Sequence, residues 1–387
     1  MTVLFDRVET GGEDCNGNQV SNREKDKSKM KQNMQDLTEG SLGKKILIFS
    51  VPLMLSNLLQ VLFNMADIAV IGQFAGSLSL GAVGSTATLV TMFTGFLIGL
   101  SGGINVLTAL YYGAKDKDSL SKTIHSAALV SLIMGVLLLV LGVGLSEWML
   151  TALKTKEELL DKAVLYLRIY YLGMPALAIY NFGNAVYSAV GNTKKPLYYL
   201  GFSGVLNIIL NLFFVIVCRM DVAGVALASI ISQYVSAVLI LQALLRSKDI
   251  YALHPGKLRM DRELTRDILK LGMPSGLQNV IFQFANSFVQ MGVNSFDATM
   301  VAGNSAASNA DALVYDVMAA FYTACGSFMG QNYGAGKRKE CGTVTSSAWY
   351  IPSASVCFWE CHWWFSEDRF CLCLPEMRQL WMPECIV

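Results

Sequence analysis

Long apolar stretches, separated by short polar ones, make up most of this chain. Between residues 46 and 114 the only charged residue is Asp67, and residues 169–193, 196–218, 222–245 and 271–296 carry no charge. A helix that crosses a bilayer needs about 20 mainly apolar residues. The pattern therefore predicts an all-α polytopic membrane protein with helices over residues 45–68, 80–111, 120–150, 160–188, 196–218, 222–246, 266–294 and 300–334.

Two short motifs occur twice, about 220 residues apart. The spacing Pro-x4-Asn-x6-Asn begins at Pro52 and again at Pro274, and Tyr-Gly-Ala occupies residues 112–114 and 333–335. Internal duplication of a group of membrane helices is common among secondary transporters, which place their binding site between the two halves. The repeat predicts a two-lobe transporter with its second lobe starting near residue 266.

The predicted spans and the repeat divide the chain into five parts. They are a disordered cytoplasmic tail (1–43), an N-lobe of six helices (44–246), a cytoplasmic linker (247–265), a partial C-lobe of two helices (266–339) and an aberrant tail (340–387). After Lys339 come five of the six tryptophans and six of the nine cysteines. We hypothesise a frameshift near Glu340; a metal site in the tail, from Cys357, Cys361, His362, Cys371 and Cys373, is the alternative. Two of six helices cannot enclose a cavity, so we expect the chain as written to be inactive.

Composition and charge narrow the class of protein. Hydrophobic residues make up 53% of the chain and charged residues only 15%, with a net charge of +1. Lysine and arginine concentrate in alternate loops, so the positive-inside rule predicts a multi-pass protein of the plasma or inner membrane with a cytoplasmic N-terminus. The basic run over residues 23–31 lacks interleaved aromatics, which argues against nucleic acid. No Walker A loop, dinucleotide fingerprint or nucleophile–base pair is present, so we expect neither an enzyme nor a bound cofactor.

Asp67 is the first candidate for chemistry. A carboxylate inside a membrane helix costs about 2.5–3.5 kcal/mol on insertion scales, and such a residue normally faces a cavity, binds an ion or carries a proton. The alternative places Asp67 at the membrane surface, ending its helix, since 22 residues from Lys45 already span about 33 Å. Asn207 and Asn211 are four residues apart on one helical face and could bind a cation with it. Their alternative role is to hydrogen-bond neighbouring helices.

The remaining polar residues of the apolar helices are weaker candidates. For most of them we expect either lining of a substrate cavity or hydrogen bonds between helices; they are Asn57, Gln60, Asn64, Asn181, Gln278, Asn279 and Gln283. Pro52 and Pro274 can kink a helix and act as hinges, or fix a kink for packing. Gly99, Gly102 and Gly103 predict close helix packing. Asp311 and Asp316 are expected near the outer start of their helix, where they either face a cavity or, as we favour, are exposed to solvent.

The order of several motifs resembles the multidrug and toxic compound extrusion (MATE) family, in its DinF-like and NorM-like branches. The similarity extends over residues 38–339. The segments that carry it are residues 52–67, Tyr112-Gly113-Ala114, Gly191-Asn-Thr-Lys-Lys-Pro196, Asn207-Ile-Ile-Leu-Asn211, Val222-Ala-Gly224-Val-Ala226 and Gln331-Asn-Tyr-Gly-Ala-Gly-Lys337.

The resemblance implies a twelve-helix, two-lobe, monomeric exporter of drug-like cationic or amphipathic molecules, driven by exchange for H+ or Na+. Asp67 would match the acid of the family's first helix, Asn207 and Asn211 the polar pair beside it, and Pro52 a hinge. Ser188 stands where many relatives have arginine. The seventh helix lacks the NorM-type acid, which favours an ion site in the N-lobe. The alternatives are a lipid-linked oligosaccharide flippase of the same superfamily and, from another class, an eight-helix channel or receptor.

Overall fold

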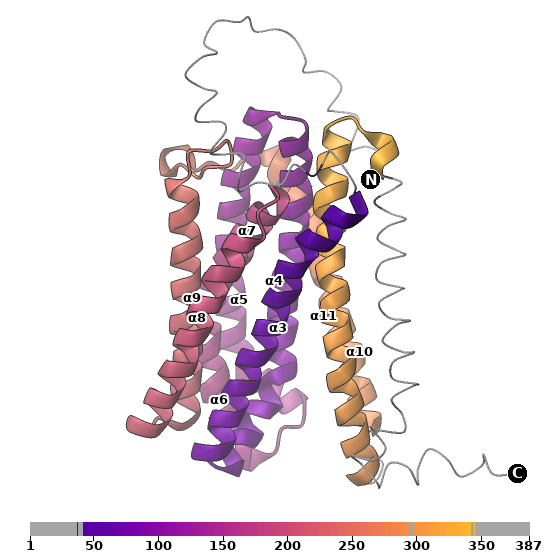
Figure 1. Ribbon diagram of the computed structural model, residues 1–387. Coiled ribbons are helices and arrows are strands. Elements are labelled where there is room, and N and C mark those ends of the chain that lie inside the picture. Colours follow the sequence, from indigo (N-terminus) through magenta and orange to yellow (C-terminus); the bar gives the residue numbers. More distant parts are fainter. Residues whose placement is uncertain (1–36, 38–41, 294–297, 342–343, 345–387) are drawn as a thin grey trace, which may run out of the picture.

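The computed structural model describes residues 37, 42–293, 298–341 and 344, and within them all regular structure is helical (Figure 1). The long helices lie side by side in one elongated bundle. They are α3 (Leu42–Phe74), α4 (Ser77–Gly113), α5 (Lys117–Ala152), α6 (Glu157–Tyr171), α7 (Met174–Ala189), α8 (Lys194–Leu212), α9 (Asp221–Arg246), α10 (Arg262–Val293) and α11 (Ala298–Gly334), with the short π-helical turn η2 (Phe213–Val217) and 3-10 turn η3 (Pro255–Lys257). The prediction of a wholly helical membrane protein is confirmed.

One predicted helix is broken in two. The segment expected as a single span over residues 160–188 forms α6 and α7, which bend by 47° at their junction. Gly173 sits at the break and Pro175 follows in the first turn of α7. Proline has no N–H for the preceding turn, and its ring clashes with the carbonyl four residues earlier, so a continuous helix is disfavoured there.

The helices of the described chain that qualify as membrane spans all lie between Gly43 and Arg246. Five helices are long and apolar enough to cross a membrane, or six if the bent α6–α7 pair forms one span. Helices α10 and α11, also predicted as spans, are 32 and 37 residues long but do not reach this apolarity in the described residues. Amide side chains along α10 and a charged first turn account for its lower hydropathy.

The two helices of the second repeat pack directly on the first half. Helix α10 contacts α4 most, while α11 contacts both α4 and α3. Glycines make the α4–α10 contact close: a Cβ on Gly99 would lie 2.5 Å from the Gly276 nitrogen, and one on Gly103 would lie 2.6 Å from the Gly272 nitrogen. The packing role predicted for Gly99 and Gly103 is confirmed, whereas a Cβ on Gly102 would meet no atom within 4 Å.

The segment between α9 and α10 is docked against the bundle. Tyr251 and Leu253 are buried in the cluster formed by α4, α5, α7 and α9. The His254 N–H donates to Nε2 of buried His125 on α5 (3.0 Å), and the Asp261 N–H donates to Oγ of Ser126 (2.9 Å). Helix α10 begins at Arg262, so the linker ends four residues earlier than the predicted boundary at 265.

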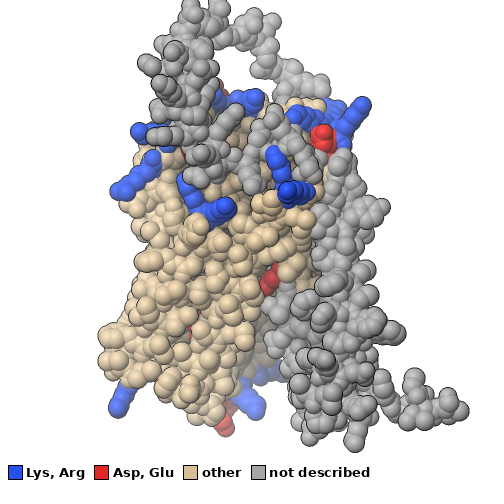
Figure 2. Space-filling model, viewed as in Figure 1, with Lys and Arg blue, Asp and Glu red and all other residues tan. Residues whose placement is uncertain are grey.

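Charged side chains concentrate at the ends of the bundle. On the face drawn in Figure 2, lysines and arginines gather at the upper end, where α3 begins and where α9 connects to α10. Most of the surface between the two ends is uncharged. This distribution is typical of a protein that crosses a bilayer, with an uncharged belt between charged ends.

Candidate functional site

Asp67 lies inside α3, seven residues before its last residue, Phe74. The alternative in which Asp67 ends its helix is therefore wrong. Helix α3 continues past residue 68 because Ile68, Val70 and Ile71 prolong the apolar pattern, and Val70 and Ile71 are buried against α4, α6 and α9. The carboxyl group thus lies within the apolar helix rather than at its end.

Polar side chains from two other helices contact the Asp67 carboxyl group. The Asn211 amide of α8 donates a hydrogen bond to Oδ1, and the Ser229 hydroxyl of α9 donates to Oδ2 at 3.2 Å. Asn211 also donates to Oδ1 of Asn207 (3.1 Å), and Asn207 donates to Oγ of Ser229 (3.3 Å). These four residues form a closed ring of hydrogen bonds, which we call the Asp67 network.

Local sequence places each member. Asn207 and Asn211 are one turn apart on α8, so both amides point the same way, and both are buried. The π-helical turn η2 follows at Phe213, directly after Asn211. Such single π-turns are frequent at functional sites. Ser229 lies in the first half of α9 with small neighbours, Ala226 and Ala228, which allow a close approach.

The network offers oxygen ligands and no positive partner among the described residues. The Asp67 carboxylate is the only charged group in it, and the buried Oδ1 of Asn211 has no hydrogen-bond donor. A buried acceptor without a donor is costly unless something else occupies that position. Carboxylate, amide and hydroxyl oxygens are the ligands that hard cations prefer, and a proton on Asp67 would instead donate to one of them. No cluster of three His, Cys, Asp or Glu residues exists in the described chain, so a transition-metal site is not indicated there.

Aromatic residues enclose the network on the α6 side. Tyr166 and Tyr170 of α6 lie within electrostatic range of Asp67. The two rings stack with centroids 5.9 Å apart. Sequence reasoning missed Ser229 and these tyrosines, because serine and tyrosine recur throughout the helices. Ser229 is 162 residues from Asp67 in the sequence, a separation at which spacing does not indicate a contact.

The structure does not bring the other predicted residues into this network. Asn57 donates to the Asp316 carbonyl (2.9 Å) and Asn279 donates to the Gly95 carbonyl (2.9 Å), so both connect helices. The Asn181 amide is buried without an acceptor in the described residues. Gln60, Asn64 and Gln278 are exposed, and Gln283 is half-buried. Their role as cavity lining stays a prediction.

Both prolines predicted as hinges lie inside unbroken helices. Pro52 is buried in α3 and Pro274 is exposed in α10. The Ser56 hydroxyl donates to the Pro52 carbonyl at 2.9 Å. A single conformation does not test a hinge, so that role also stays a prediction.

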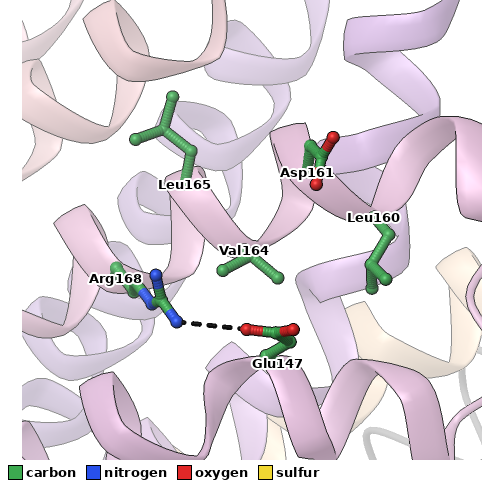
Figure 3. Close-up of a pocket in the computed structure, with 6 residues that line it drawn as sticks. All are labelled: Glu147, Leu160, Asp161, Val164, Leu165 and Arg168. Carbon is green, nitrogen blue, oxygen red and sulfur yellow. Dashed lines mark hydrogen bonds and ion pairs between the residues drawn. The ribbon is translucent and has the colours of Figure 1, made fainter.

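Two surface hollows lie away from the Asp67 network. One, of about 220 Å³, is bordered by α5 and α6 and contains the exposed ion pair between Arg168 and Glu147, at 3.3 Å (Figure 3). The other, of about 360 Å³, lies between the ends of α3 and η2, bordered by Phe74, Arg219 and Asp221 among others. None of the residues predicted as functional borders either hollow.

Comparison with known proteins gives a consistent result. A sequence model of the MatE family matches residues 52–213 and 274–372. The second range extends beyond Glu340, where the aberrant tail was predicted to begin. "Probable multidrug resistance protein YpnP" of Bacillus subtilis (strain 168) is 33% identical over 305 residues, 79% of this chain and 68% of the relative. "Probable multidrug resistance protein YoeA" of the same organism is 26% identical over 313 residues, 78% of this chain and 66% of the relative.

The fold has matches of the same kind among solved structures. A crystal structure of "MATE in the bent conformation" superposes with a TM-score of 0.75 at 25% identity, covering 81% of this chain and 70% of the other. The chain thus spans about two thirds of the length of the curated relatives that it matches.

Proposed function

Because the chain belongs to the MatE family of multi-pass membrane transporters, which are not enzymes, we propose that it serves secondary active export of cationic or amphipathic small molecules in exchange for H+ or Na+. The observation that carries this proposal is the Asp67 network: one carboxylate, two amides and a hydroxyl, held inside three apolar helices. The printed names of the relatives, as multidrug resistance proteins, support drug-like substrates.

Exchange is possible if the driving cation, bound at the Asp67 network, and the exported small molecule favour opposite conformations of the protein. A cation or proton on Asp67 removes an uncompensated negative charge from an apolar region, which changes the preferred arrangement of α3, α8 and α9. A ligand shifts a conformational equilibrium only through its different affinity for the two states. Export against a gradient then requires that the small molecule favour the state from which the cation has left.

The charge distribution supports an orientation. The basic loops lie at the end of the bundle where α3 begins, so that end would face the cytoplasm, in a monomer within the cell membrane. A lipid-linked oligosaccharide flippase is less well supported, since phosphate recognition calls for basic residues and the Asp67 network has none in the described chain. The named relatives argue against a channel or receptor.

The direct test is ethidium uptake into everted membrane vesicles of bacteria that lack their own exporters, because an exporter in an everted membrane moves its substrate inward. We would compare the chain with a chimera in which residues 1–339 precede the part of the Bacillus YpnP relative that this chain does not span. We expect the chimera to move ethidium when a proton or sodium gradient is imposed, and to stop when the gradient is collapsed. A chimera that inserts into the membrane but moves no dye under either gradient would contradict the proposal.

Ser229 provides a graded test of the network. Ser229→Ala removes the hydroxyl that bridges Asp67 and Asn207, and a lost hydrogen bond to a charged group costs about 1.5–3 kcal/mol. We expect the concentration of the driving cation at half-maximal efflux to rise roughly tenfold or more, since 1.4 kcal/mol corresponds to a factor of ten. Ser232→Ala, one turn along α9 and outside the network, is the control. Equal behaviour of the two variants would exclude Ser229 from the cation site.

A further inference from the structure

The two copies of the Tyr-Gly-Ala motif end α4 and α11 in the same backbone turn. In the first copy, the N–H groups of residues 114, 115 and 116 donate to the carbonyls of residues 110, 112 and 111. In the second copy, each of these hydrogen bonds recurs 221 residues later, from residues 335, 336 and 337 to residues 331, 333 and 332. The residue after each motif is in the left-handed region, Lys115 with φ 57° and Gly336 with φ 73°. The duplication seen in the sequence is therefore also a duplication of local structure.

The two motif turns lie against each other, at the end of the bundle where α3 begins (Figure 1). A Cβ on Gly113 would overlap the Gln331 carbonyl oxygen, and a Cβ on Gly334 would overlap the Leu110 carbonyl oxygen. Gly113 and Gly334 are equivalent positions of the repeat, and so are Leu110 and Gln331. Each contact is thus the counterpart of the other. Such reciprocity is expected where two repeats meet about an approximate two-fold axis.

Small residues let α4 and α11 cross on this axis. A Cβ on Gly330 would lie only 2.7 Å from Cβ of Ala109, and these two buried residues are themselves equivalent in the repeat. Equivalent positions can meet each other only on the symmetry axis. The absence of larger side chains at this crossing allows the two backbones to approach closely. The two halves of the repeat therefore touch at their centre, near this end of the bundle.

Hydrogen bonds of buried side chains join the same ends of the helices. The Ser327 hydroxyl donates to Oδ1 of Asn105 on α4 (3.1 Å), and the Asn105 amide donates to the Ala185 carbonyl of α7 (3.1 Å). The Gln331 amide donates to the Ala189 carbonyl of α7 (2.6 Å). Because hydrogen bonds to protein can be exchanged for hydrogen bonds to water at a small net cost, a contact of this kind can open and close again.

We propose that the two Tyr-Gly-Ala turns form the cytoplasmic gate of the transport path, which main-chain contact at Gly113 and Gly334 holds closed in this structure. This inference rests on the proposed export function, for which it names the residues that separate and rejoin. Transporters built from two repeats bind their substrate between the repeats and rock one against the other. Contact on the axis at one end closes the path at that end. The lysines that follow both turns, Lys115, Lys117 and Lys337, assign this end to the cytoplasm.

The first test measures access to a buried thiol in everted vesicles that contain the full-length chain. Ser327→Cys places a thiol at the α4–α11 contact, and a membrane-impermeant maleimide added outside reaches only the cytoplasmic face. With both glycines present we expect slow labelling of this thiol, measured by mass spectrometry. Gly334→Ala should speed the labelling roughly tenfold or more, because the added methyl group meets main-chain atoms of Leu110 and Ala114 and forces the turns apart.

The repeat supplies a matched variant and α4 supplies a control. Gly113→Ala should speed the labelling of the Ser327→Cys thiol to a similar extent, because the contacts of the two turns are reciprocal. Gly102→Ala adds the same methyl group to α4 at a position where it meets no atom within 4 Å, so it should leave the labelling rate unchanged. Slow labelling in both Gly113→Ala and Gly334→Ala would overturn the assignment of the gate.

A disulfide across the contact tests whether the gate must open during transport. A Cβ on Gly326 would lie 3.6 Å from Cγ2 of Val106, so Val106→Cys combined with Gly326→Cys brings two thiols within reach of each other. In the chimera that carries residues 1–339, we expect oxidation of this pair to stop ethidium transport and dithiothreitol to restore it.

The two tests separate failure of the gate from failure of the export function. Full transport by the oxidised, cross-linked chimera would overturn the gate and leave the export function standing. A chimera without the cysteine pair that moves no dye would contradict the export function, whereas the labelling of Ser327→Cys reports on the contact without any transport.

Discussion

Replacing Asp67 by asparagine is expected to abolish cation-driven ethidium efflux in the chimera. The amide keeps the size of the side chain but removes the charge, and its NH2 group cannot accept one of the two hydrogen bonds that the carboxylate accepts from Asn211 and Ser229. At an effective dielectric constant of 20 and a separation of 4 Å, a unit charge pair contributes about 4 kcal/mol. Affinity for the driving cation should therefore fall roughly 1,000-fold, since each 1.4 kcal/mol is a factor of ten. Efflux under an imposed gradient is the measurement.

Two comparisons make the Asp67 result specific. Asp67→Glu keeps the carboxylate and should retain partial coupling, with a changed dependence on cation concentration. Asp118→Asn removes an exposed acid from the first turn of α5 and should leave efflux unchanged. Running the assay with only a proton gradient and then only a sodium gradient identifies the driving ion. Full gradient-driven efflux in Asp67→Asn would remove Asp67 from the coupling mechanism.

The second large effect is expected at Gly99, where α4 meets α10. An alanine Cβ there would lie 2.5 Å from the Gly276 nitrogen and 2.6 Å from its Cα. The obstructing atoms belong to backbone, so no side chain can rotate away and the helices must separate. Overpacking of this kind costs about 1–3 kcal/mol. Gly99→Ala should lower the apparent Tm of the purified protein in detergent and the yield of monodisperse protein.

Gly102→Ala is the matched control on the same helix. A Cβ at Gly102 meets no atom within 4 Å, and alanine favours helix over glycine by about 1 kcal/mol. We expect the Tm of this variant to be unchanged or slightly higher. If Gly99→Ala and Gly102→Ala gave the same Tm, the close approach of α4 and α10 would not be a source of stability.

Sequence reasoning located part of the candidate site because charge and helical spacing are local properties. Asp67 stands alone in a long apolar stretch, and Asn207 and Asn211 share a face of one helix whatever the tertiary fold. Their hydrogen bond across 144 residues and the contribution of Ser229 depend on how α3, α8 and α9 pack. No local pattern distinguishes Ser229 from Ser232 or Ser236 on the same helix.

The errors in the helix predictions also have physical causes. Apolarity alone cannot detect the break between α6 and α7, since the residues on both sides are apolar and the interruption comes from Gly173 and Pro175. The expected position of Asp316 near the start of its helix is wrong, because Asp316 is the middle residue of α11, which begins at Ala298 and extends to Gly334.

The docked linker before α10 bears on how the protein is assembled during synthesis. Tyr251, Leu253 and the backbone of His254 are anchored on the first half, and α10 starts only eight residues after His254. Loop-closure entropy grows with the length of the free segment, so a short tether from a fixed point reduces the conformational search. Once the first six spans have packed, the seventh would emerge beside the α4 glycines that receive it. The packed first half would then guide the insertion of the second half into the membrane.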